Sequence, residues 1–227
     1  MLTDAEIVVL ERRLRGPAGM ARAAVALLLD HNAEMARTEL LAEEATLRRY
    51  FRRALPPQPG RFGFSPCDIA TLAACDVLGH APADRKLGEL TIAFDPTVAT
   101  VAWSGCGPRA VDPALALIAW LLGDEALSAR HLVHCRPEGI LDRLLTQVVS
   151  LLVRDRGDEV GGVLTGLGPE YAAAMGRGLW RSDPEAFLHV RLLAALQVGA
   201  ERGCMDISTL PDTIPYAPIW FLNPNRA

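Results

Sequence analysis

The first third of the chain alternates apolar and polar residues in the pattern of amphipathic helices. Thr3 precedes Glu6 by three residues, which is the spacing of a capping box and predicts a first helix over residues 3–14. A glycine–proline pair ends that helix, and further helices are expected over residues 17–29 and 33–55. The third helix ends in a run of arginines, whose charge suits the negative end of a helix dipole.

Beyond the proline-rich residues 56–63, helices that begin with a proline recur along the chain. The first combines a Ser cap, a Pro and an acidic residue at 65–68, and the same device at residues 183–185 predicts a last helix to about residue 202. Residues 114–122 are apolar on every side, so this helix should be buried. Residues 140–154 are amphipathic and should bury one stripe.

Residues 89–103 depart from the helical pattern. Two segments on either side of a central Asp-Pro pair are rich in Thr and Val and alternate with a period of two. They predict one small β-hairpin that carries Ile92, Phe94 and Trp103. Because two strands alone are marginal in water, the hairpin should lie on helices or gain another strand.

The end of the chain, residues 206–227, combines prolines with large apolar side chains. Its prolines exclude a long helix, and Tyr216, Trp220 and Phe221 make it too apolar for a free tail. We expect an extended arm that places its aromatic side chains in a groove, either on its own chain or on a partner.

These elements together predict a mainly α fold, a single-domain helical bundle over residues 1–227 with one small β-hairpin. Residues 1–55 form an N-terminal helical arm, residues 56–205 a helical core, and residues 206–227 the extended arm. The glycine-rich residues 157–168 follow a predicted helix rather than a strand, so they are interpreted as a loop between helices and not as a phosphate-binding turn.

Composition and charge narrow the class of protein. Half of the 227 residues are hydrophobic, 22% are charged and the net charge is −4, which is typical of a globular chain and makes nucleic acid an unlikely partner. The longest strictly apolar run is too short to cross a membrane. Five cysteines without a framework spacing, and a start without a signal sequence, predict a cytoplasmic protein.

The strongest candidate for a catalytic residue is Cys106. Glycines flank it between a predicted strand and a predicted helix, an arrangement similar to a nucleophile elbow. A thiolate needs a base or a positive neighbour, and Arg109, His131 or His134 could serve. The alternative is an ordinary tight turn in which the thiol packs inward.

Two loose groups of residues contain possible metal ligands. One group is His131, His134 and Cys135, and the other is Cys67, Cys75 and His80. Neither has the paired spacing of a structural zinc site, so no metal ion and no cofactor are predicted.

No set of residues supplies a nucleophile, a base and a charge stabiliser together. The apolar arm and the edges of the predicted hairpin are instead features of a surface that binds protein. The sequence therefore predicts a non-catalytic adaptor, accessory or assembly subunit that binds another protein or peptide, or itself. The alternatives are a cysteine-dependent enzyme built on Cys106, and a helical protein that binds a small ligand.

Overall fold

The chain is mainly helical, as the sequence predicts. A computed structural model describes residues 19–54, 65–95, 108–137, 139–178, 187–210 and 217–222. Its α-helices are α2 (Gly19–Leu28), α3 (Ala33–Ala54), α4 (Pro66–Gly79), α6 (Pro108–Leu122), α7 (Glu125–His134), α8 (Ile140–Val153), α9 (Val160–Gly176) and α11 (Val190–Glu201). Its 3₁₀ helices are η1 (Pro82–Asp84), η2 (Leu87–Phe94), η3 (Gly157–Glu159), η5 (Ile207–Thr209) and η6 (Ile219–Leu222).

The helices begin where the capping residues are. Ser65 caps α4: its Oγ accepts a hydrogen bond from the Asp68 N–H, and the Asp68 carboxylate accepts one from the Ser65 N–H. Asp124 caps α7 in the same way through the Leu127 N–H. The last helix is shorter than predicted, because residues 187–189 precede α11 without helical structure.

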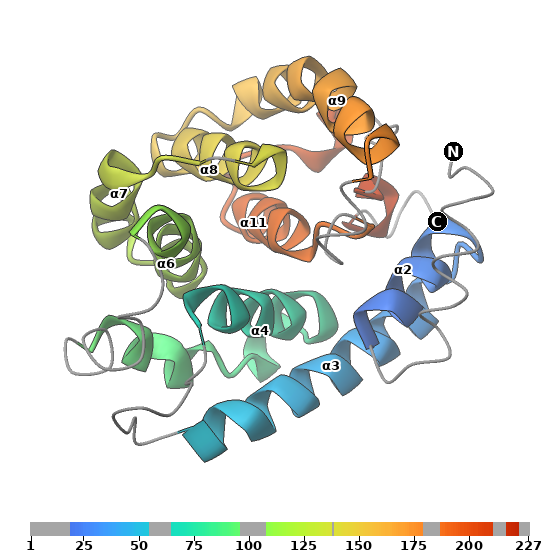
Figure 1. The fold of residues 1–227 in the computed structure, drawn as a ribbon, viewed down its shortest axis with the longest axis vertical. Coiled ribbons are helices and arrows are strands. Elements are labelled where there is room, and N and C mark those ends of the chain that lie inside the picture. The colour runs from blue at the N-terminus through green and yellow to red at the C-terminus, as the bar shows by residue number, and fades with distance from the viewer. Residues whose placement is uncertain are drawn as a thin grey trace.

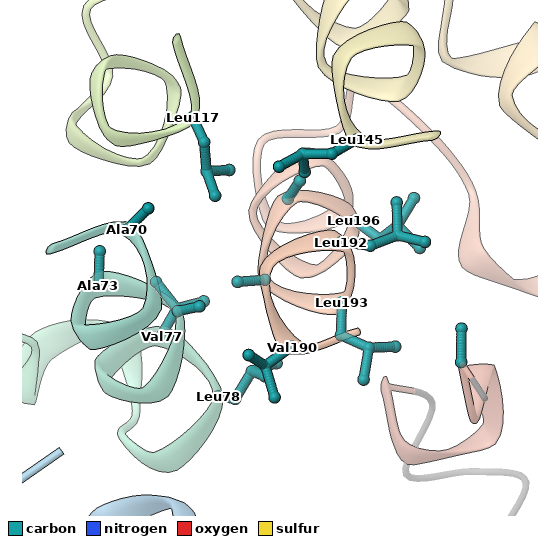
Figure 2. Packing of buried hydrophobic residues seen from close by; sticks show 14 of the residues in the cluster. Ala70, Ala73, Val77, Leu78, Leu117, Leu145, Val190, Leu192, Leu193 and Leu196 are labelled. Atoms are coloured by element: carbon teal, nitrogen blue, oxygen red, sulfur yellow. The ribbon is translucent and has the colours of Figure 1, made fainter. Parts of the chain in front are cut away.

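Helices α4 and α11 pack against each other at the centre of the molecule (Figures 1 and 2). Helix α6 covers α4 from one side, and α8 covers α11. The core is made mostly of Ala, Leu and Val, and its largest fully buried side chain is that of Trp120. The indole Nε1–H of Trp120 donates to the Ala195 carbonyl oxygen at 3.3 Å, so its one polar group is satisfied.

The predicted β-hairpin near residues 89–103 is wrong. Residues 87–94 form the 3₁₀ helix η2, and the part of the chain that the structure describes contains no strand. Leu90 and Ala93, three positions apart, are both buried against the core, which is the spacing of a 3₁₀ turn and not of a strand. The second half of the predicted hairpin, with Trp103, lies outside the described residues.

Residues 157–168 are also not the loop that their glycines suggested. They form η3 and the first half of α9. Val160, Leu164, Tyr171 and Met175 recur at helical spacing along α9 and are buried. Packing of this stripe against α8 therefore outweighs the low helix propensity of glycine.

The described part of the C-terminal arm packs on its own chain. Residues 219–222 form one 3₁₀ turn and not the extended chain that we expected, and Ile219 and Phe221 are buried. The guanidinium of Arg37 lies 4.9 Å from the centre of the Phe221 ring. None of the helices in the described ranges is long and apolar enough to span a membrane.

Candidate functional site

Only part of the predicted thiol site can be located. Cys106 lies outside the described residues. His131, half-buried on α7, has its Nδ1 atom 3.1 Å from Oδ1 of Asp112 on α6. The ring of Phe94 lies against His131, with centroids 5.9 Å apart. His134 is exposed at the end of α7.

The Asp112–His131 pair has a known chemical use. When Nδ1 carries the proton, its N–H donates a hydrogen bond to the carboxylate, which holds the imidazole in one orientation and leaves its Nε2 atom as a proton acceptor. The same contact also ties the start of α6 to the end of α7, as a purely structural pair would.

The described cysteines do not resemble reactive thiols. Of the four described cysteines, Cys75 and Cys135 are buried, and Cys67 and Cys204 are half-buried. Burial raises the pKa of the Cys135 thiol to about 12, so this residue is protonated at neutral pH. Burial also raises the pKa of Cys204.

The residues predicted to bind a partner are largely turned inward. Ile92 and Phe94 are half-buried against the core, Phe221 is buried, and Trp220 is half-buried beside His31, with ring centroids 5.7 Å apart. Trp103 and Tyr216 lie outside the described residues. The four described side chains therefore contribute little exposed apolar surface.

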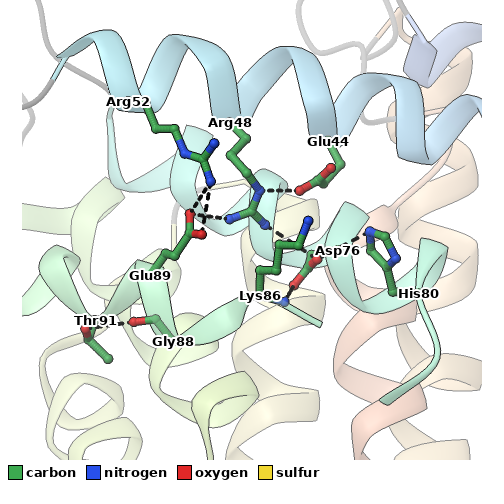
Figure 3. Close-up of polar contacts among 9 residues, drawn as sticks. All are labelled: Glu44, Arg48, Arg52, Asp76, His80, Lys86, Gly88, Glu89 and Thr91. Atoms are coloured by element: carbon green, nitrogen blue, oxygen red, sulfur yellow. Dashed lines mark hydrogen bonds and ion pairs between the residues drawn. The ribbon is translucent and has the colours of Figure 1, made fainter. Parts of the chain in front are cut away.

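A cluster of charged side chains between α3, α4 and η2, which we call the Arg48 cluster, was not predicted. Its members are drawn in Figure 3: Glu44, Arg48, Arg52, Asp76, His80 and Glu89. Arg48 is buried; its Nε–H donates to Oε1 of Glu44, and its Nη1–H donates to Oε2 of Glu89 at 2.8 Å. The exposed Arg52 adds a second guanidinium to Glu89 at 3.1 Å.

Asp76 lies at the bottom of the Arg48 cluster and is completely buried. Its Oδ2 atom accepts the Lys86 N–H at 2.8 Å. Its Oδ1 atom has no hydrogen-bond partner; it lies 3.5 Å from Arg48 Nη2 and 3.7 Å from His80 Nε2. Burial raises the pKa of Asp76 above its usual value, although the Lys86 N–H and the Arg48 charge act in the opposite direction.

Glu89 shows the opposite balance at the rim of the cluster. Burial acts to raise the pKa of its carboxyl, but the hydrogen bonds and charges of Arg48 and Arg52 outweigh it and hold the pKa below its usual value. The cluster thus favours the ionised form of the carboxyl at its rim and disfavours that of the carboxyl in its interior.

Glu44, Asp76 and His80 are the one set in the described ranges that could hold a metal ion. Their ligand atoms all lie within 4.8 Å of one another. The two groups considered from the sequence do not gather three such atoms in the described structure; His80 joins two carboxylates and not Cys67 and Cys75.

A second feature is the surface of α3 that faces away from the core. Met35, Thr38, Ala42, Ala45 and Arg49 are all exposed and follow one another at spacings of three and four residues. We call these five residues the α3 outer face. Helix α3 runs along one edge of the molecule (Figure 1).

Comparison with protein families, curated proteins and solved structures finds no match to the chain.

Proposed function

We propose that the chain is a non-catalytic protein-binding subunit that accepts a helix of its partner on the α3 outer face. The observation that carries the proposal is the spacing of that face. Exposed positions separated alternately by three and four residues form a narrow, straight stripe, the pattern by which one helix packs against another. A helix face that stays in water usually carries charge, but between Met35 and Ala45 this stripe carries none.

The side chains on and beside the stripe suit a packed helix. Ala42 and Ala45 at its centre are small enough for two helix axes to approach to about 8–10 Å. Met35, with 49% of its surface exposed, and Tyr50, with 57%, are the large apolar residues at the two ends of α3. Tyr and Arg are frequent among the residues that dominate interface energies, and Arg49 and Tyr50 lie together at one end.

The charge at the two ends of α3 indicates the chemistry of the partner. Glu34 lies in the first turn, and Arg49, Arg52 and Arg53 are exposed near the last turn. A partner helix that carries acidic residues opposite this arginine-rich end, with small or apolar residues along the stripe, is complementary in charge. We propose that binding takes place in the cytoplasm.

A double substitution tests the proposal. Ala42→Arg with Ala45→Arg fills the centre of the stripe and should weaken partner binding by about tenfold or more, because the helices can no longer approach. Helix content and thermal stability should not change, since both alanines are exposed and arginine is a good helix former. The partner is captured from native cells with the wild-type chain, and its affinity is then measured with purified proteins.

The matched control is Ala172→Arg, because Ala172 is an exposed alanine on α9, far along the chain from α3. It should bind the captured partner with wild-type affinity. Equal affinity of the wild-type chain and the α3 double variant would reject the α3 outer face as the binding surface. If Ala172→Arg and the α3 double variant lose partner binding equally, the loss is a non-specific effect of added charge.

A second candidate function is cysteine-dependent catalysis, and the Asp112–His131 contact is the observation that favours it. In this proposal His131 is the base, Asp112 orients it, and Cys106, six residues before Asp112 in the chain, is the nucleophile.

Thiol reactivity separates the two candidates. If the second is right, Cys106 reacts with iodoacetamide at neutral pH faster than the other four cysteines, and His131→Gln slows that reaction. Labelling is followed by mass spectrometry of the digested chain. Cys135 should label most slowly, because burial raises its pKa to about 12. A rate at Cys106 no higher than that at Cys67 or Cys204 would reject catalysis by this thiol.

A further inference from the structure

We propose that Glu44, Asp76 and His80 bind one divalent first-row transition-metal ion, of the kind represented by Zn²⁺ and Co²⁺, between α3 and α4. Glu44 comes from the middle of α3, Asp76 from the last turn of α4, and His80 from the residue that follows α4. Figure 3 shows their three side chains together on one side of Arg48. One carboxylate oxygen of each acid and one imidazole nitrogen lie within 4.8 Å of one another, so small side-chain rotations would let a single ion contact all three.

The buried Oδ1 atom of Asp76 is the independent sign of a ligand. A completely buried carboxylate oxygen normally has a hydrogen-bond partner, and this one has none. The Lys86 N–H holds the other oxygen at 2.8 Å and so fixes the direction of the carboxylate. Contacts of this kind, which orient a ligand without touching the ion, are typical of metal sites.

The charge balance favours a cation despite the nearby arginine. Glu44 and Asp76 face one buried guanidinium, that of Arg48, while Glu89 at the rim is shared with Arg52. Two buried carboxylates therefore share one buried guanidinium, and a metal ion would add a second positive charge. Arg48 keeps its hydrogen bond to one oxygen of Glu44, and a carboxylate can bond a guanidinium through one oxygen and a metal ion through the other.

The ligand set and its access select the class of ion. One imidazole and two carboxylates suit borderline ions such as Zn²⁺ and Co²⁺, whereas Ca²⁺ takes oxygen ligands only. His80 has 24% of its side chain exposed, so an ion can enter past it from solvent. The repulsion from Arg48 should make binding weaker than at a site without a neighbouring cation.

The alternative occupant is a water molecule. A water between Arg48 Nη2 and Asp76 Oδ1, which are 3.5 Å apart and both lack hydrogen-bond partners, would satisfy both atoms. The two occupants give different results when Co²⁺ is added. A metal site binds a fixed number of Co²⁺ ions per chain and gives them a visible absorption spectrum, whereas a site that holds water does neither.

The test titrates the full-length chain, freed of metals with a chelator, with CoCl₂ and follows visible absorption. We expect one Co²⁺ per chain and a rise in melting temperature with ZnCl₂. His80→Gln and Glu44→Gln should each weaken Co²⁺ binding by about tenfold or more, because each removes one of three ligands. The matched control is His131→Gln, since His131 is also half-buried beside a carboxylate but belongs to no group of three possible ligands among the described residues.

Three results would overturn the proposal. They are no Co²⁺ binding by the wild-type chain, equal affinity of wild type and His80→Gln, and a near-ultraviolet charge-transfer band that shows cysteine thiolates as the ligands. His80→Gln is the decisive variant because its side chain is partly exposed, so the fold does not depend on it; Glu44→Gln is used only where its circular dichroism matches that of wild type.

Discussion

Arg48→Ala is expected to lower the free energy of unfolding by about 3–5 kcal/mol, the range observed when one partner of a buried ion pair is removed. The substitution leaves Glu44 and Asp76 buried without their guanidinium, and it also removes the arginine stem that packs between α3 and α4. The loss is measured as the shift in the urea unfolding midpoint at neutral pH.

Arg49→Ala is the matched control for this experiment. Arg49 is the next residue in the same helix but is exposed, so its loss should change the unfolding free energy by less than about 0.5 kcal/mol. Arg48→Lys should recover only part of the stability, because one ammonium group cannot reach the three carboxylates that the guanidinium contacts. If Arg48→Ala and Arg49→Ala unfold at the same urea concentration, the Arg48 cluster does not stabilise the fold.

Gly157→Ala is expected to cost about 3 kcal/mol of unfolding free energy. A Cβ atom on Gly157 would lie 1.9 Å from the backbone carbonyl oxygen of Cys204 and 2.7 Å from the Met205 Cβ. Because the first of these is a backbone atom, the segment after α11 would have to move away from η3, and overpacking of this kind is strongly destabilising. Thermal unfolding followed by circular dichroism measures the effect.

Gly162→Ala provides the opposite result as a control. Gly162 lies in α9, and a Cβ atom there meets nothing within 4 Å. Alanine removes the entropy cost of glycine in a helix, so the variant should be more stable by about 0.5–1 kcal/mol. A stabilising effect of Gly157→Ala, or a similar loss at both sites, would contradict the backbone contact as the cause.

The sequence predicted elements well where the pattern is local and repeated. The seven apolar residues of the expected stripe on residues 140–154 are all buried in α8: Ile140, Leu141, Leu144, Leu145, Val148, Val149 and Leu152. The cap and the first turn of α4 also lie where Ser65 and Pro66 placed them. In both cases one helix contains its own signal, so no knowledge of distant residues is needed.

The predicted hairpin near residues 89–103 and the predicted loop over residues 157–168 were wrong because both segments depend on packing that the sequence does not reveal. The period-two pattern of residues 89–94 is too short to separate a strand from a 3₁₀ turn. Packing of η2 on α4 and α6, which buries Leu90 and Ala93, selects the turn. The glycines of α9 weaken its local preference for a helix, but contact with α8 restores it.

The candidate site was harder to predict than the fold because its residues come together from three segments. Charged residues of an amphipathic helix normally face solvent, yet Glu44 and Arg48 are both buried. The sequence contained one signal of the site. Asp76 lies within the mostly apolar residues 69–78, and an acid buried there destabilises the fold unless it has a polar or charged partner. Which partner it faces is decided by the crossing of α3 and α4.

The Arg48 cluster also bears on how the protein could be divided. Its contacts join a helix that precedes the proline-rich residues 56–63 to a helix that follows them. These contacts therefore hold the two helices together in addition to the chain that links them. If the chain is divided within this stretch, each of the two pieces carries one side of the ionic and apolar contact between α3 and α4. Such a pair could be used as a split reporter whose two pieces reassemble.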